Sequence, residues 1–192
     1  MNFDEFLTAY PISGQAVPYS DGEINKLKDE VPDDLLNFFR QMGRCSFADG
    51  FLTTVYPYDI DYKSMLKQWG LKKKGEPIVF LKTVFGLCFF YLDKKYYYLD
   101  APRGLYERFA GSANLAFNNV ISSWAMINEI SMYPVYMEHR SSLPPLKNDE
   151  VYMLVPAMPL GGSFEKSKLE PGKLLEHLFI LAELYDNQAV AR

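Results

Sequence analysis

The stretch from Pro77 to Leu99, PIVFLKTVFGLCFFYLDKKYYYL, limits the fold more than any other part of the chain. It holds three apolar runs, at 78–81, 87–92 and 96–99. Aromatic and β-branched residues dominate these runs, and such residues favour the pleated, half-buried surface of a sheet. The polar residues 93–95 lie between the last two runs and suit a short hairpin turn. We therefore predict neighbouring strands of one main sheet.

The middle run of this stretch is apolar on both of its faces. Successive side chains of a strand point to opposite sides. This places Leu87, Phe89 and Tyr91 on one face and Cys88, Phe90 and Leu92 on the other. A strand with two apolar faces needs cover on both of them. We therefore predict that this strand is central and covered on both sides.

Helices and further strands are predicted on either side of this stretch. Apolar side chains at a helical spacing predict helices at 2–10, 22–29, 32–43, 58–69, 112–130 and 173–185. Other β-prone runs predict a hairpin at 44–56 around Asp49-Gly50, a strand at 150–156 and an edge strand within 163–169. Glycine and proline mark 11–22 as a loop and 100–110 as a turn region. The predicted fold class is α+β, with a central, mostly antiparallel, twisted sheet flanked by helices.

Charge and cysteine usage narrow the class of protein. The net charge of −4 does not suit a protein that binds nucleic acid directly, because such proteins usually carry a basic surface. It suits a basic partner protein instead. Cys45 and Cys88 are too few for a disulfide framework and are expected to be buried apolar residues. The first ten residues do not resemble a signal peptide, and no run reaches the length of a membrane span, so we expect a cytoplasmic protein without membrane contact.

A search for catalytic or metal-binding patterns finds none. The two histidines, His139 and His177, lie far apart in the sequence, and no H-x-x-x-H or C-x-x-C spacing is present. Phosphate-binding loops and nucleophile elbows are also absent from the sequence. Gly161-Gly162 is read as a conformational loop rather than an anion site. We therefore expect no catalytic residue, no metal and no cofactor.

Three segments resemble known families. The first two carry the pattern of the GAD-like domain, with matching residues at Pro32, Leu35 or Leu36, Gly43, Asp49-Gly50, Pro57 and Phe85-Gly86. The third resembles the C-terminal domain fused to GAD-like domains in immunity proteins of type VI secretion DNase toxins, with markers at Glu150-Val151-Tyr152, Pro156, Leu160-Gly161-Gly162 and the helix 175–184. The resemblance covers nearly the whole chain. It implies a GAD-like domain at 1–108 and an immunity-type domain at 109–192, packed as one compact unit.

The resemblance also implies a function. Such a protein binds a cognate antibacterial toxin, with a DNase favoured, and neutralises it by occluding its active or substrate-binding surface. No catalysis and no bound cofactor are implied. Two alternatives remain open: a regulatory module that senses a small molecule or peptide in a pocket beside the sheet, and an enzyme of unrecognised type.

Two segments combine carboxylates with aromatic residues, as an inhibitor of a nuclease would require. Carboxylates can compete with phosphates for a basic surface, and aromatic side chains can anchor the complex. The expected partner-binding residues are Tyr58, Asp59, Asp61, Tyr62 and Trp69 in the first segment, and Tyr133, Tyr136 and Glu138 in the second. The alternative is that these aromatic side chains pack inward and the acidic residues form a solvated face.

Overall fold

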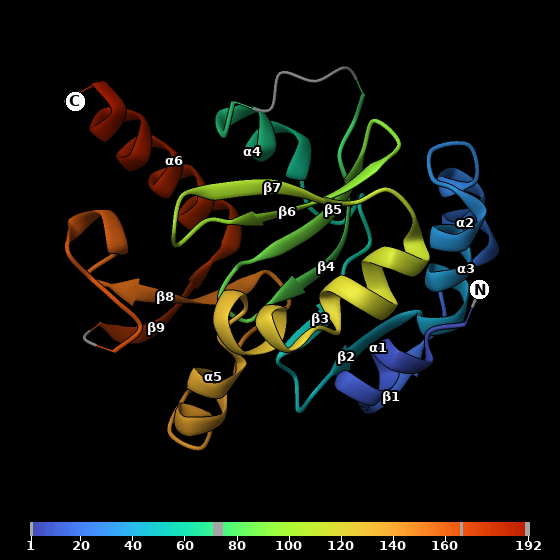
Figure 1. The fold of residues 1–192 in the computed structure, drawn as a ribbon, viewed down its shortest axis with the longest axis horizontal. Helices are drawn as coiled ribbons and strands as arrows, with labels where there is room; N and C mark the ends of the chain where they lie inside the picture. Colours follow the sequence, from blue (N-terminus) through green and yellow to red (C-terminus); the bar gives the residue numbers. More distant parts are fainter. Residues whose placement is uncertain (1, 71–74, 166, 191–192) are drawn as a thin grey trace.

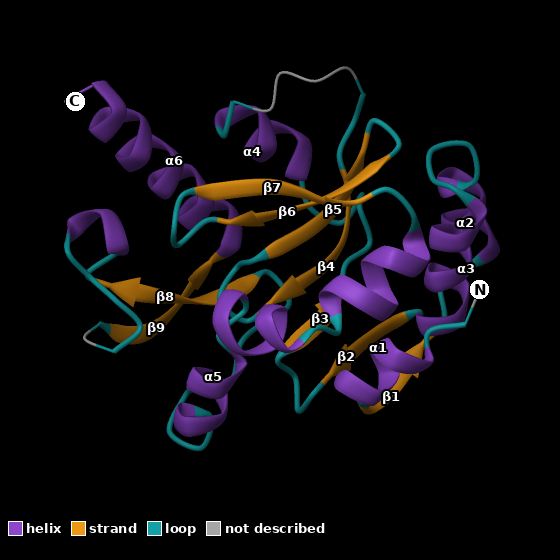
Figure 2. Cartoon of the chain, in the orientation of Figure 1, coloured by secondary structure: helices purple, strands orange, loops and turns teal. Residues whose placement is uncertain are grey.

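The computed structural model describes residues 2–70, 75–165 and 167–190. A seven-stranded sheet occupies the centre, with helices packed around it and a two-stranded sheet near the C-terminus (Figures 1 and 2). The α-helices are α1 (Asp4–Ala9), α2 (Asp21–Leu27), α3 (Asp33–Met42), α4 (Tyr62–Gln68), α5 (Tyr133–His139) and α6 (Leu174–Val190). Two π-helical segments, η1 (Leu115–Ile121) and η2 (Met126–Ile130), and a 3-10 turn, η3 (Met158–Leu160), complete the helical elements. The predicted α+β fold class is confirmed.

The main sheet is a meander, in which each strand pairs antiparallel with the next one along the chain. Its strands are β1 (Ile12–Val17), β2 (Arg44–Phe47), β3 (Leu52–Thr54), β4 (Ile78–Thr83), β5 (Cys88–Leu92), β6 (Lys95–Asp100) and β7 (Leu105–Ala110). The predicted strands at 78–81, 87–92 and 96–99 are confirmed as β4, β5 and β6. The hairpin predicted within 44–56 is confirmed as β2 and β3.

The turn between β5 and β6 closes a regular hairpin. Asp93 and Lys94 both have positive φ angles, 55° and 59°, as the two central residues of a type I′ turn require. Leu92 pairs with Lys95 on either side of the turn. The predicted hairpin is confirmed, with a turn one residue shorter than the polar run because Lys95 belongs to β6.

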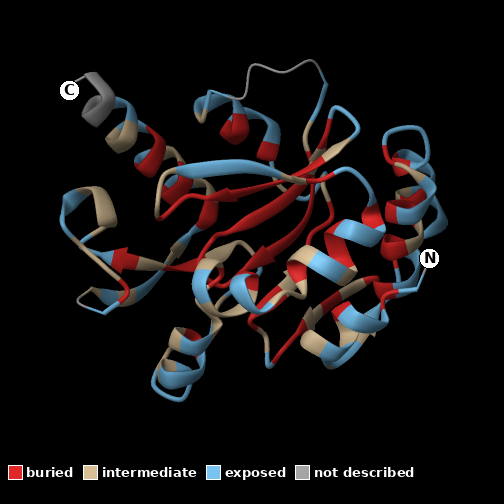
Figure 3. Ribbon diagram, viewed as in Figure 1, coloured by how far each residue is buried: buried red, intermediate tan, exposed pale blue. Residues whose placement is uncertain are grey.

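The first face of the sheet carries the larger of two hydrophobic cores, and the buried residues of both are drawn in red in Figure 3. Phe38 of α3 and Phe117 of η1 pack with their ring centroids 4.4 Å apart. Both rings contact Phe80 of β4, at 6.4 Å and 5.3 Å between centroids. Phe89 of β5 lies in the same core and is 1% exposed. The first face of the sheet is therefore covered by helices that precede β2 and by the π-helical segment that follows β7.

The second face carries a smaller core beneath α4 and α6. Cys88, Phe90 and Leu92 of β5 face this core, together with Tyr62 and Met65 of α4 and Leu174, Leu178 and Leu181 of α6. Leu87 and Phe89 belong to the first core. The predicted alternation of β5, with apolar cover on both faces, is thus confirmed.

The second face changes character part of the way across the sheet. Residues paired directly across antiparallel strands lie on the same face. One such row runs through Ser13, Ser46, Thr53, Lys82, Cys88, Leu99 and Tyr106. Its members on β1 to β4 are polar, whereas Cys88 and Leu99 are apolar and fully buried. Helices α4 and α6 contribute to the core over the apolar part, and the polar part borders a cavity.

The two edge strands were not predicted. Residues 11–22 were expected to form a loop and 100–110 a turn region, but β1 and β7 lie within them. Most residues of both strands are exposed, and β7 is largely pale blue in Figure 3. An edge strand buries few side chains and often carries charges, so it lacks the apolar alternation of an inner strand. Gly14 (φ +78°) also lies where the register of β1 shifts, as at a β-bulge.

Several boundaries differ from the predictions. Helix α4 begins at Tyr62 rather than at 58, because residues before Asp61 form turns. The helix predicted at 112–130 is interrupted between η1 and η2. The predicted end of the third helix at Gly43 is confirmed. A Cβ atom on Gly43 would lie 2.4 Å from the Val17 carbonyl oxygen, so the close approach of β1 requires glycine there.

The C-terminal part adds a two-stranded antiparallel sheet, made of β8 (Glu150–Val155) and β9 (Lys168–Lys173). Strand β8 confirms the predicted 150–156 strand, whereas the edge strand expected within 163–169 begins only at Lys168. The Tyr152 N–H donates to the Val84 carbonyl at 2.7 Å, which ties β8 to the end of β4. The predicted division of the chain after residue 108 falls within β7 and stays a prediction.

Candidate functional site

The polar part of the second face forms the floor of a groove of about 730 Å³, which we call the polar groove. Its floor is made by Arg44, Ser46, Thr53 and Lys82, from β2, β3 and β4. One wall is the 55–60 loop that leads into α4, and the other is the 146–150 loop that leads into β8. The groove therefore joins segments that are far apart in the sequence.

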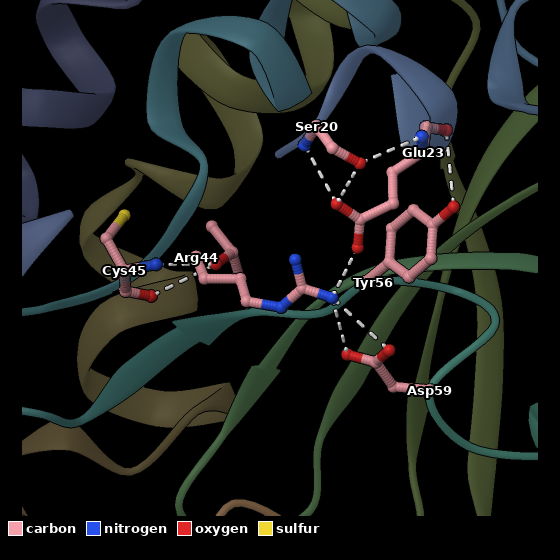
Figure 4. Close-up of polar contacts among 7 residues, drawn as sticks. Ser20, Glu23, Arg44, Cys45, Tyr56 and Asp59 are labelled. Atoms are coloured by element: carbon pink, nitrogen blue, oxygen red, sulfur yellow. Dashed lines mark hydrogen bonds and ion pairs between the residues drawn. The ribbon is translucent and has the colours of Figure 1, made fainter. Parts of the chain in front are cut away.

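Arg44 organises one end of the polar groove (Figure 4). Its Nη2 donates to Glu23 Oε1 at 2.7 Å and to Asp59 Oδ2 at 3.2 Å. Its guanidinium carbon lies 4.6 Å from the centre of the Tyr19 ring and 5.2 Å from that of Tyr56, a cation–π arrangement. Arg44 thus fastens the 55–60 loop to β2 and α2.

Helix α2 presents Glu23 to Arg44 through a capping box. The Ser20 N–H donates to Glu23 Oε2 at 2.8 Å, and the Glu23 N–H donates to Ser20 Oγ at 3.3 Å. Ser20 is the capping residue, one position before α2 begins at Asp21. The hydrogen bonds from Arg44 and Ser20 lower the pKa of Glu23 to about 2. Glu23 is therefore ionised at neutral pH and shares the charge of Arg44 with Asp59.

Lys82 organises the other end. It is only 8% exposed, and its Nζ donates to the Glu150 carbonyl oxygen at 3.1 Å. Burial lowers the pKa of the Lys82 ammonium. At the rim, the Glu150 carboxylate lies 3.6 Å from Lys147 Nζ, and Asp149 pairs with Lys173. This end of the groove holds a desolvated cation surrounded by ion pairs.

The two cysteines are buried and free, as predicted. The Cys45 N–H and carbonyl both bond to Thr54 Oγ1, at 2.8 Å and 3.1 Å. Burial raises the pKa of the Cys45 thiol to about 11 and that of Cys88 to about 12. Both are therefore thiols at neutral pH, and the nucleophilic thiolate form is suppressed. Among the described residues, no group of three or more acidic, histidine or cysteine side chains could hold a metal ion.

The first predicted partner-binding segment is partly exposed. Tyr58 and Asp59 lie at the surface, where the Tyr58 hydroxyl donates to the Glu30 carboxylate and Asp59 pairs with Arg44. Asp61 is exposed and caps α4, accepting from the Ser64 N–H at 3.1 Å. The remaining two aromatic residues pack inward, as the alternative predicted: Tyr62 is 2% exposed and Trp69 is half-buried with its ring 6.1 Å from that of Tyr185.

The second predicted segment lies on α5, at the opposite end of the molecule from α4 in Figure 1. Tyr136 is buried and its hydroxyl donates to the Asp49 carbonyl at 2.7 Å. Tyr133 is half-buried with its ring 4.9 Å from that of Phe51, and Glu138 is exposed. The structure therefore does not join the two segments into one surface, and the role of both in partner binding stays a prediction.

Sequence reasoning missed the polar groove. Lys82 is a charged residue within an otherwise apolar run, IVFLKTVF, and that exception was a usable signal. Arg44 gave no such signal, because a single arginine beside a cysteine is an ordinary sequence feature. Its partners come from α2 and the 55–60 loop, which only the fold brings together.

Comparisons with known proteins identify two families. The model described as GAD-like domain matches residues 1–99. The model described as T6SS immunity protein Tdi1, C-terminal, matches residues 116–185. No curated protein matches the chain. The crystal structure of Atu4351 from Agrobacterium tumefaciens is similar over 95% of this chain and 89% of that chain, with a TM-score of 0.70 and 16% identity, which shows a shared fold alone.

The polar groove lies between the two matched segments. Its floor and the 55–60 wall belong to residues 1–99, whereas the 146–150 wall belongs to residues 116–185. Helix α6, which covers the apolar part of the same sheet face, also begins within the second match. The two segments therefore share a core at one side of this face and leave an opening at the other.

Proposed function

We propose that this chain, which belongs to the GAD-like family and carries the C-terminal domain of the type VI secretion immunity protein Tdi1, neutralises a cognate effector by covering the effector's active or substrate-binding surface. The observation that carries the proposal is the match to the immunity family over residues 116–185. An immunity protein implies a cognate effector as its partner. Under this proposal the chain acts by binding and has no catalytic role.

A nuclease is the effector class that we favour. A nuclease must attract phosphates, so its substrate surface is expected to be basic. The net charge of −4 on this chain suits such a partner. Asp61 and Glu138 are exposed carboxylates in the predicted segments, and Tyr58 is an exposed aromatic residue in the same segment as Asp61. Asp59 contributes less to this attraction, because Arg44 already balances its charge.

The polar groove supports a second candidate, a module that senses a small molecule or peptide. Its volume of about 730 Å³ falls within the usual range for small-molecule sites. Such sites are mostly apolar, however, whereas the floor of this groove carries Arg44, Ser46, Thr53 and Lys82. We therefore rank sensing below immunity.

Co-expression with the product of the neighbouring gene, as the candidate effector, tests the proposal. The effector alone should arrest growth of the host bacterium, and co-expression of the chain should restore it. A catalytically inactive effector should co-purify with the chain, with a dissociation constant measured by calorimetry. Failure of both protection and complex formation would overturn the immunity function. A ligand that raises the Tm of the free chain, without any complex with the effector, would favour the sensing module.

A further inference from the structure

Lys82 occupies an unusual position for a lysine. It lies on β4, whose six residues are all buried, between Thr53 of β3 and Cys88 of β5 in the row described above. Lysine is rarely buried to this extent unless it is paired. Its side chain lines the polar groove, so the ammonium lies at the point where the apolar sheet core meets the opening.

The bonds of Lys82 do not fully compensate for its burial. An ammonium group has three N–H donors, and the one hydrogen bond of Lys82 within the described part of the chain goes to the Glu150 carbonyl oxygen. The carboxylates that attract the ammonium, Asp149 and Glu150, are paired with Lys173 and Lys147 at the rim. Desolvation outweighs their attraction and lowers the pKa of the ammonium. A buried cation in this state gains from an additional anionic partner.

The remaining charges of the groove indicate which partner that is. Asp59 is paired with Arg44, and Asp149 with Lys173, so each of these carboxylates already has a cation. A basic group entering the groove would meet the Lys82 ammonium and be repelled. An acidic group would find an ammonium that makes a single hydrogen bond to the described residues, in a groove bordered by the 55–60 and 146–150 loops. Lys82 is only 8% exposed, so a group that reaches its ammonium must protrude from the surface of the partner.

We propose that the polar groove receives an acidic side chain, glutamate or aspartate, from a protruding segment of the effector, and that the Lys82 ammonium binds its carboxylate. This inference rests on the proposed immunity function, since the effector supplies the acidic group. It assigns the docking site to the opening between the two family segments and not to the surface of α4 or α5. The overall attraction joins the acidic surface of this chain to a basic effector surface. The Lys82 contact is a separate, local one of opposite sense, in which a cation of this chain meets a carboxylate of the effector.

The test compares Lys82→Met with Lys168→Met in binding to the inactive effector. Both changes remove one positive charge, but Lys168 lies on β9 and does not line the groove. Lys82→Met should weaken binding at least about tenfold, as expected for loss of one partner of a buried charge pair. Lys168→Met should bind within about twofold of the wild type. The Tm of Lys82→Met should be unchanged or higher, because methionine fills the same space without a buried charge.

A second measurement covers the case in which Lys82→Met does not fold. The pKa of the Lys82 ammonium in the wild-type chain can be followed by NMR through its Nζ and Cε signals. It should rise when the inactive effector binds, because a carboxylate stabilises the charged form. Acetate and inorganic phosphate are titrated in parallel as free anions.

Each outcome decides the inference. A rise in pKa with the effector, and weaker binding by Lys82→Met where that variant folds, supports it. An unchanged pKa in the complex overturns it, even if Lys82→Met binds weakly, because Lys82 would then act only by holding the 146–150 loop. A rise with acetate or phosphate but not with the effector also overturns it. In these last two cases the proposed immunity function still holds if the wild-type chain binds the inactive effector. If the wild-type chain does not bind the effector, both proposals are overturned.

Discussion

The two halves of the second sheet face share one row of paired residues but differ in chemistry. Over β5 and β6, Cys88 and Leu99 are fully buried in the core that α4 and α6 complete. Over β2 and β3, Ser46 and Thr53 are half-buried and border the polar groove. The transition occurs at Lys82, which is buried as Cys88 and Leu99 are but has a charged side chain.

This difference separates stability from binding within one surface. Burial of apolar side chains supplies most of the free energy of folding, so the covered half holds the C-terminal segment onto the sheet. Polar side chains gain little from burial, so the other half can stay open without a large loss of stability. The same sheet face therefore joins the two family segments and leaves a groove between them.

Removal of α6 should have the largest effect, because it uncovers the apolar half of the second sheet face. A chain that ends at Gly172 exposes Val151, Phe90 and the rest of the second core. We expect insoluble protein, or a soluble chain without a cooperative unfolding transition. Expression trials and thermal unfolding followed by circular dichroism measure this. Soluble, cooperatively folded truncated protein would show that α6 contributes little to the fold.

A single substitution in the covered half tests the same difference. Phe90 is fully buried, and its ring is stacked on that of Tyr97 with centroids 5.4 Å apart. Phe90→Ala should reduce the free energy of unfolding by about 3–5 kcal/mol, through lost burial and a cavity. Thr53→Ala, in the open half of the same face, is the control and should change it by no more than about 0.5 kcal/mol. Denaturant unfolding measures both free energies. Equal losses in the two variants would show that the covered and open halves contribute alike to stability.

The covered half should also make stability depend on pH. His177 of α6 is buried, and burial lowers its pKa to about 4 from the ordinary 6.5. Between these two values the unfolded chain binds more protons than the folded chain, so stability falls as the pH drops from about 6.5 towards 4. The full loss is about 3 kcal/mol. Unfolding measured at a series of pH values should show this loss, and His177→Leu should remove it; an unchanged slope in the variant would exclude His177 as its source.

The smallest expected effect concerns the first predicted partner-binding segment, which lies beside the open half of the second sheet face. Asp59→Asn with Asp61→Asn removes two charges, while asparagine still caps α4. Association with the inactive effector should slow several-fold at low salt and depend less on salt, because electrostatic steering is weakened. Stopped-flow mixing measures both. Asp4→Asn with Glu5→Gln on α1 is the charge-matched control, and an equal slowing there would assign the effect to net charge alone.

Much of the fold could be predicted from local patterns. The alternation of Phe89 with Phe90 indicated a strand buried on both faces, and the polar run at 93–95 indicated the hairpin. Strands β1 and β7 could not be predicted in this way, because an edge strand is defined by its neighbour and not by its own apolar pattern. The start of α4 was missed for a related reason, since turn residues before Asp61 share the aromatic spacing of the helix.

The sequence by itself determined the inner strands, the final helix and the resemblance to the two families, because each depends on residues close together along the chain. Only the tertiary structure decided which half of the second face is covered, and where Arg44 and Lys82 find their partners. Those partners lie on α2, the 55–60 loop and the 146–150 loop, which are separated by long stretches of sequence. Hydrogen bonds and ion pairs act over a few ångströms, so the groove exists only after the sheet has brought these segments together.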